Sequence, residues 1–247
     1  MAAAVYVGTS GWFYDHWEGV LYPRGLPKSR RFEVYAAAFN AVEINATFYR
    51  LPRPSAVEGW RKKAPGGFVF VAKANQEITH RRRLRNAEEP LKRFLEALEP
   101  LGELLANVLF QLPPSLRKDI PLLEDFLALL PDHPRASFEF RHPSWECDEV
   151  FEVLRKAAMS HVVVSRSGYP FAEAHTSDIA YFRCHGPGRM FASSYTDEWL
   201  AGLAVKIAAL AREGITSFTF FNNDVAGHAV RNADTLKAHL ALAGLAC

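Results

Sequence analysis

Cysteine is scarce in this chain of 247 residues: Cys147, Cys184 and Cys247 lie far apart and form no CxxC pattern. This scarcity excludes a disulfide-stapled scaffold and a zinc ribbon, and it favours reduced thiols. Apolar runs of the roughly 18 residues that a membrane span needs are also lacking, and the opening MAAAVYVGTSGW has no signal-like regions. The sequence therefore predicts a cytoplasmic location and no membrane partner.

The chain also has little net charge, +2, and no linker, low-complexity tract or close internal repeat. Its first hundred residues are mildly basic, too weakly to indicate nucleic-acid binding on charge alone. A hydrophobic content of 49% with 23% charged residues is ordinary for a globular protein. We expect one domain over residues 1–247 with a substantial core.

Eight short runs of β-branched and aromatic residues alternate with amphipathic stretches, which predicts a parallel sheet with helical crossovers. The predicted strands are 4–10, 41–49, 68–74, 106–112, 136–141, 161–165, 179–185 and 217–223. The predicted helices are 31–39, 54–63, 88–102, 119–130, 145–158, 196–212 and 225–243, with Ser144 as N-cap of the fifth. An α/β fold of the (β/α)8 TIM-barrel type, with its sixth helix (between 166 and 178) missing or vestigial, fits this order best. An open α/β sheet is the alternative.

Polar residues fall late in at least six of the eight strands, where a barrel forms its mouth. They are Glu43, Asn45 and Thr47 on one face of their strand, then Lys73, Gln111, Glu139, Arg141, Arg183, His185, Asn222 and Asn223. In FEFRHPSW, alternation places Glu139 and Arg141 inside the barrel and the flanking phenylalanines outside. A charge taken out of water costs several kcal/mol unless it is paired, so these residues form either an ion-pair plug or a polar ligand pocket.

The motifs VGTSGWFYDHW, FNAVEINATFYRLP, FVFVAKANQEITHRRRL, LFQLPPSL, FEFRHPSW, AYFRCHG and FFNND occur in this order. Together they resemble the domain of unknown function 72 family, the YecE-like proteins, from Val7 to about Leu240. The resemblance implies a TIM-barrel-like fold and brings no activity with it. One departure is Ser165, where the resemblance leads us to expect an acid. The residues that match the family motifs are Thr9, Ser10, Trp12, Glu43, Asn45, Lys73, His80, Gln111, Glu139, Arg141, Arg183, His185, Asn222 and Asn223.

We favour a pocket for an anionic small molecule or nucleotide, because three cations outnumber two carboxylates and arginine suits carboxylate or phosphate. The glycines of HGPGR (185–189) are predicted to bring backbone N–H groups to an oxyanion. The predicted catalytic residues, as acid/base groups or their partner, are Lys73, Glu139 and His185. The predicted ligand-binding residues are Glu43, Asn45, Gln111, Arg141, Arg183, Asn222, Asn223 and Trp12.

Two alternatives stay open. A divalent metal has potential ligands in Glu43, Glu139, His185, His80 and Asp224, but no HxH or HExxH spacing supports it, so no cofactor is assigned. The basic run THRRRLR (79–85) instead suggests a non-catalytic nucleic-acid-binding module. If the chain is an enzyme, we expect a hydrolase or an isomerase/lyase acting on an anionic substrate. The sequence fixes neither that substrate nor the oligomeric state.

Overall fold

A computed structural model describes residues 3–167 and 173–247 of the chain. Eight parallel strands follow one another in sequence order around a closed barrel, and the last pairs with the first. The strands are β1 Val5–Ser10, β2 Ala41–Ile44, β3 Val69–Lys73, β4 Leu105–Gln111, β5 Arg135–Glu139, β6 Ser160–Ser165, β7 Ile179–Cys184 and β8 Thr216–Phe221. The predicted TIM barrel is therefore confirmed, and the alternative of an open sheet is wrong.

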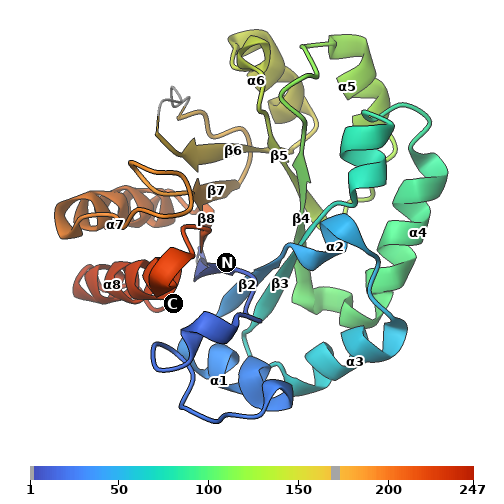
Figure 1. Cartoon of the computed structure of the whole chain (residues 1–247). Helices are drawn as coiled ribbons and strands as arrows, with labels where there is room; N and C mark the ends of the chain where they lie inside the picture. The colour runs from blue at the N-terminus through green and yellow to red at the C-terminus, as the bar shows by residue number, and fades with distance from the viewer. Residues whose placement is uncertain (1–2, 168–172) are drawn as a thin grey trace.

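Helices form an outer ring around the barrel, as Figure 1 shows. They are α1 Arg31–Ala38, α3 Pro54–Lys63, α4 Glu88–Leu98, α5 Ile120–Leu127, α6 Asp148–Lys156, α7 Asp197–Arg212 and α8 His228–Leu242, while the short α2 Ala46–Tyr49 lies between this ring and the strands (Figure 1). Helix α7 shows which local interactions determine where a helix starts and ends. The Thr196 side chain accepts a hydrogen bond from the Trp199 N–H at its start, two acidic residues follow in the first turn, and Arg212 lies in the last. These features stabilise the two ends of the helix.

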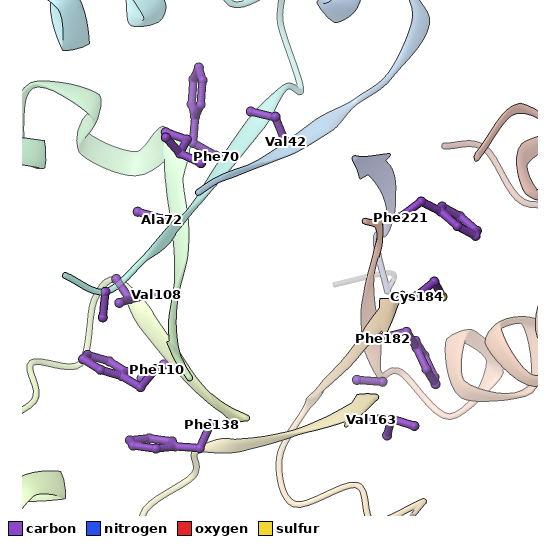
Figure 2. Packing of buried hydrophobic residues seen from close by; sticks show 14 of the residues in the cluster. Val42, Phe70, Ala72, Val108, Phe110, Phe138, Val163, Phe182, Cys184 and Phe221 are labelled. Carbon is purple, nitrogen blue, oxygen red and sulfur yellow. The ribbon is translucent and has the colours of Figure 1, made fainter. Parts of the chain in front are cut away.

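The strands separate two hydrophobic layers. Outward-facing side chains such as Phe110, Phe138 and Phe182 point away from the barrel interior toward the helices (Figure 2). The lower interior is filled by a second buried cluster that includes Leu109 and Phe220. Because side chains alternate along each strand, the same faces that bury these apolar residues carry the polar residues two positions later, at the mouth.

The segment 41–49 was predicted as one strand, and this is wrong beyond Ile44. Strand β2 ends there, and Ala46–Tyr49 forms the single turn of α2. The Thr47 hydroxyl lies 2.7 Å from the carbonyl oxygens of Ile44 and Lys73, to which it donates. Thr47 therefore ties the turn to β2 and β3, and does not continue the interior face of β2.

The predicted N-cap at Ser144 is also wrong. Pro143–Trp145 forms a short 3₁₀ turn, and α6 begins only after Cys147. The Ser144 hydroxyl oxygen accepts a hydrogen bond from the Lys118 backbone N–H at 2.8 Å, so it joins two loops. In the segment 166–178, the described residues 166–167 and 173–178 contain no helix, as predicted, and the remaining positions lie outside the described residues.

Within residues 3–167 and 173–247, no helix combines the length and the apolar character that a membrane crossing requires.

Candidate functional site

A buried arginine, Arg183, lies at the centre of the polar layer above the apolar interior. Its Nε and Nη2 donate to the two carboxylate oxygens of Glu43, at 2.8 and 2.7 Å, and its Nη1 donates to Glu139. Strands β7, β2 and β5 supply these three residues, and each is at most 1% exposed. One guanidinium therefore holds two carboxylates from separate strands in a fixed geometry.

Glu43 is fully satisfied by hydrogen bonds. Beside the two bonds from Arg183, it accepts one from the Ser10 hydroxyl and one from the Tyr181 hydroxyl, each at 2.7 Å. The strand register contributes, because Ser10 on β1 pairs with Glu43 on β2. A carboxylate buried this deeply is tolerated because every lone-pair direction has a donor.

Glu139 is held in the same way from the other side. Its Oε1 accepts from the Gln111 amide at 2.9 Å and contacts the Arg141 Nε, while its Oε2 faces Arg183. Burial alone would raise the pKa of Glu139, but Arg183 and Arg141 hold that pKa well below its usual range. Burial would likewise lower the pKa of Arg183, but Glu43 and Glu139 keep it above its usual value. Glu139 and Arg183 therefore stay charged at any physiological pH.

Lys73 at the end of β3 completes the layer. Its Nζ donates to Gln111 Oε1 at 2.8 Å and lies 4.2 Å from the centre of the Phe48 ring. Burial, reinforced by the charge of Arg183, lowers the pKa of Lys73 to about 8. Gln111 thus links the lysine to Glu139, and through it to Arg183 and Glu43. The lysine exchanges its proton near neutral pH, which the arginines cannot do.

His185 lies among donors. Its Nε2 is 3.4 Å from Arg141 Nη2 and 3.5 Å from Arg183 Nη1, and the amide of Asn222 lies 3.1 Å from its Nδ1. Burial and the charge of Arg183 hold the pKa of His185 well below its usual value. The ring is therefore neutral at pH 7, with one nitrogen facing the two guanidinium groups and the other facing the Asn222 amide.

A cavity of about 440 Å³ opens above this layer at the C-terminal mouth. Its floor contains Lys73, Arg141 and His185, and its rim contains Tyr14, Phe191 and Asp224. Among the predicted site residues, those that line the cavity are Asn45, Lys73, Gln111, Arg141, Arg183, His185 and Asn222. Glu43 and Glu139 lie beneath the floor with no exposed surface, so they reach a ligand only through their neighbours.

Two predicted ligand-binding residues lie elsewhere. The Asn223 amide donates to the Ser193 carbonyl at 2.9 Å and to Asn232 Oδ1 at 2.8 Å, because Asn223 faces outward where Asn222 faces inward. Trp12 lies in a neighbouring cavity, packed edge-on against Phe32 and Trp60. Neither residue lines the mouth cavity.

Sequence reasoning missed other members of the site. Tyr181 lies two residues before Arg183 on the same strand face, so alternation alone could have indicated it. Phe191 and His16 come from loops whose course no strand pattern predicts, and His16 lies 2.8 Å from Asp224, which the sequence indicated only as a potential metal ligand.

The proposed metal ligands do not gather. Arg183 occupies both carboxylates of the layer, and Asp224 accepts from the Trp17 indole and contacts His16. His80 packs its ring edge-on against Phe48. In the part of the chain that the structure describes, no group of three or more His, Cys, Asp or Glu side chains is placed to hold a metal ion.

The HGPGR turn (185–189) and the basic run 79–85 also have hydrogen-bond or ion-pair partners within the protein. The N–H groups of Gly186 and Gly188 donate to Tyr195 and Ser193 side-chain oxygens, at 2.9 and 3.0 Å, so HGPGR forms a bonded turn and not an open oxyanion cradle. In the basic run, Arg82 pairs with Glu77 and Arg85 with Asp119.

Ser165 ends β6 on its outer face, not at the mouth. Its hydroxyl accepts from the Tyr195 hydroxyl at 2.8 Å, and its carbonyl accepts from the His185 N–H. The departure at Ser165 therefore leaves the charges of the mouth layer unchanged.

Comparisons with known proteins place the chain in a family. The family model described as "Protein of unknown function DUF72" matches residues 6–246. UPF0759 protein YecE of Escherichia coli (strain K12) is 32% identical over 142 residues, which cover 57% of this chain and 50% of that protein. UPF0759 protein YunF of Bacillus subtilis (strain 168) is 31% identical over 157 residues, or 60% and 54% of the two chains. The chain spans about half the length of the curated relatives it matches.

A solved structure agrees over nearly the whole fold. The crystal structure of a DUF72 family protein from Thermotoga maritima MSB8 has a TM-score of 0.88 and 32% sequence identity, and the match covers 96% of this chain and 99% of that one. The closed eight-stranded barrel and the family match agree with the resemblance seen in the motifs. The chain belongs to the DUF72 family of proteins of unknown function.

Proposed function

We propose that this protein binds a small anionic ligand at the mouth of the barrel and performs acid/base chemistry on it, with Lys73 as the group that exchanges the proton. The observation that carries the proposal is the lysine amine in the cavity floor, with a pKa lowered to about 8 by burial and by Arg183. A group with a pKa near the working pH is the most effective proton donor and acceptor.

The charges of the layer support an anionic ligand. Three cations, Lys73, Arg141 and Arg183, face two carboxylates, Glu43 and Glu139, and the neutral His185 adds no charge. The floor thus carries an excess of one positive charge, and the rim carboxylate of the same cavity, Asp224, has its own partner in His16. An oxyanion in the cavity would supply the missing negative charge and gain charge-assisted hydrogen bonds.

The residues then take distinct roles. Arg141 lines the cavity and binds the anionic group. Arg183 and the two carboxylates position Arg141, Gln111 and Lys73. We assign Glu139 a positioning role in place of the catalytic one expected from sequence, because Arg183, Arg141 and Gln111 occupy its oxygens. The neutral ring of His185 lies against Arg141, Arg183 and Asn222 and adds no charge.

At pH 7 about a tenth of Lys73 is unprotonated, given a pKa of about 8. This fraction serves as a base, and the protonated majority as an acid. Hydrolysis and isomerase- or lyase-type proton transfer both need such a group, so the reaction types expected from sequence stay predictions.

The cellular location, the domain organisation and the binding of nucleic acid remain predictions. A cytoplasmic location agrees with the three free cysteines, Cys147, Cys184 and Cys247. One domain over residues 1–247 stays a prediction, which limited proteolysis tests. Nucleic-acid binding by residues 79–85 is not favoured, because Glu77 and Asp119 already pair with two of its arginines.

Competitive acetylation tests the proposal. Acetic anhydride is applied between pH 6 and 11, and the labelling of Lys73 is compared with that of Lys92, an exposed lysine of α4. We expect Lys73 to reach half of its maximal reactivity near pH 8, and inorganic phosphate to protect Lys73 and not Lys92. The Arg141→Met variant should lose that protection. A midpoint above pH 10, or no protection by phosphate or sulfate, would overturn the proposal.

A further inference from the structure

A second cavity, of about 590 Å³, adjoins the mouth. It lies beside the β1 end, between the segment after β1 and helices α1, α2 and α3. Tyr14 and Asn45 line both cavities, so the two spaces share a wall. The second cavity is larger than the first, and its volume falls within the range of small-molecule sites.

The walls of this second cavity are aromatic. Trp12 meets Phe32 and Trp60 edge-on, with both pairs of ring centres 5.4 Å apart. Phe13, 56% exposed, lines the cavity as well. This set of flat, rigid surfaces is suited to stacking with another ring.

Tyr14, which belongs to the wall shared by the two cavities, is held in a fixed position. The Tyr14 hydroxyl donates to the Ser10 carbonyl at 2.7 Å, which fixes the ring. Gly11 has φ +95°, and a Cβ on it would lie 3.0 Å from the Tyr14 hydroxyl oxygen. Only glycine adopts this backbone conformation readily and leaves Tyr14 its place.

Asn45 offers an unused acceptor at the junction. Its side-chain Oδ1 is buried, and among the described residues it has no hydrogen-bond partner. It does not cap α2, although it occupies the N-cap position. A buried acceptor without a donor is unfavourable, so a ligand that brings an N–H or O–H group there binds more tightly.

Each lysine of the second cavity has a carboxylate partner. Lys28 Nζ lies 2.9 Å from Asp15, which Arg31 also contacts, and Lys63 Nζ lies 3.1 Å from Glu33, which Arg30 also contacts. These polar groups are held by one another, whereas the aromatic rings of the walls offer flat apolar surface. The walls therefore favour a flat ring as the occupant.

We propose that the second cavity receives an aromatic or heteroaromatic ring of the same ligand whose anionic group binds in the mouth, with Asn45 accepting a hydrogen bond from the part between them. The inference rests on the proposed anion site and names its substrate class: an anion that carries a ring and a neighbouring N–H or O–H donor. Trp12, misplaced for the mouth itself, contributes to the ring subsite.

Two matched pairs of probes isolate the ring. Phenyl phosphate is compared with methyl phosphate, and adenosine 5′-monophosphate with ribose 5-phosphate, by calorimetric titration of the full chain. Inorganic phosphate reports on the mouth alone. Because stacking of one base contributes about 1–3 kcal/mol, at least one ring-bearing probe should bind roughly tenfold or more tightly than its ringless partner.

Substitutions in the walls of the second cavity test whether the ring of the ligand binds there. Trp60→Leu should remove most of that advantage, whereas Trp199→Leu, in a separate cavity beside α7, should keep it. Asn45→Ala should weaken adenosine 5′-monophosphate, which carries N–H and O–H donors, severalfold more than it weakens inorganic phosphate, without lowering the unfolding midpoint, because its Oδ1 has no partner to lose.

Different binding results would refute the ring subsite and the anion site. If inorganic phosphate binds but neither ring-bearing probe binds more tightly than its partner, the ring subsite is refuted and the anion site stands. The ring subsite is likewise refuted, and the anion site stands, if the ring-bearing probe still binds more tightly than its ringless partner in the Trp60→Leu variant. If none of the five probes binds, the anion site itself is refuted, and the ring subsite with it.

Discussion

Replacing Lys73 by methionine should stabilise the protein while removing the proton-exchanging group. Burial, with the charge of Arg183, lowers the pKa of Lys73 from 10.5 to about 8. This difference corresponds to about 3 kcal/mol by which folding disfavours the charged amine. Methionine has a similar length and no charge, so this unfavourable contribution disappears.

Part of the gain is offset. The substitution leaves Gln111 Oε1 without its donor and removes the cation above the Phe48 ring, which together cost roughly 1 kcal/mol. We therefore expect the free energy of unfolding to rise by about 2 kcal/mol at pH 7, and the melting temperature by about 4–8 °C. Residues that a protein retains against its own stability are typical of functional sites.

The pH dependence gives the sharper test. Below pH 8 the lysine is charged in both folded and unfolded chains, and the variant keeps its full advantage. Between pH 8 and 10.5 the unfolded chain binds a proton that the folded chain does not, so wild-type stability rises relative to the variant and the gap closes. Other titrating groups occur in both proteins and cancel in the difference.

Urea unfolding of both proteins at pH 7, 8, 9 and 10 measures this gap, with Lys92→Met as the exposed control, for which we expect a change within about 0.5 kcal/mol. A Lys73→Met variant less stable than wild type at pH 7 would contradict the reasoning. So would a stabilisation that stays constant up to pH 10.

Three further predictions follow from the same contacts. Glu139→Gln should lower the free energy of unfolding by about 3–5 kcal/mol, because Arg183 stays buried with half of its counter-charge; a loss below 1 kcal/mol in urea unfolding contradicts the buried pair. Gly11→Ala should cost about 1–2 kcal/mol and displace Tyr14, since φ there is +95°; an unchanged melting temperature would show that the shared wall is not strained. Asn223→Ala should destabilise the protein by about 1 kcal/mol and leave sulfate affinity within twofold, because its amide contacts only loop and helix; a larger loss of affinity would return Asn223 to the site.

Much of the fold could be predicted because its signals are local. Alternation along a strand requires only neighbours, so it correctly separated Glu139, which faces the interior, from Phe138, which faces the helices. Helix α3 was predicted with its observed bounds, Pro54–Lys63, because proline at the first position and a basic last turn mark its two ends.

The pairing within the site could not be predicted in the same way. Arg183 and Glu43 are 140 positions apart in sequence, and only the closure and stagger of the barrel bring them into contact. Sequence reasoning placed both at the mouth, but it could not tell that Glu43 lies beneath the floor. Trp12 and Asn223, which do not line the mouth cavity, both come after a strand has ended, and beyond that point alternation no longer determines direction.

The balance of charges makes Lys73 decisive for binding. Arg183 with Glu43 and Glu139 forms a buried group with one net negative charge, which Arg141 neutralises. The excess positive charge of the floor is therefore that of the lysine, whose pKa lies near 8. Neither Tyr14, whose pKa is raised by burial and by Asp224 to about 12, nor His185 titrates in this range.

Anion affinity should consequently fall as the pH rises through about 8, by up to tenfold for each further pH unit while the bound anion retains the proton on the lysine. Sulfate is the suitable probe, because its own charge is constant between pH 6 and 10. In Lys73→Met the affinity should already be low at pH 7 and should not change with pH. If wild-type affinity for sulfate is level from pH 7 to 10, the arginines alone bind the anion and the lysine has no part in it.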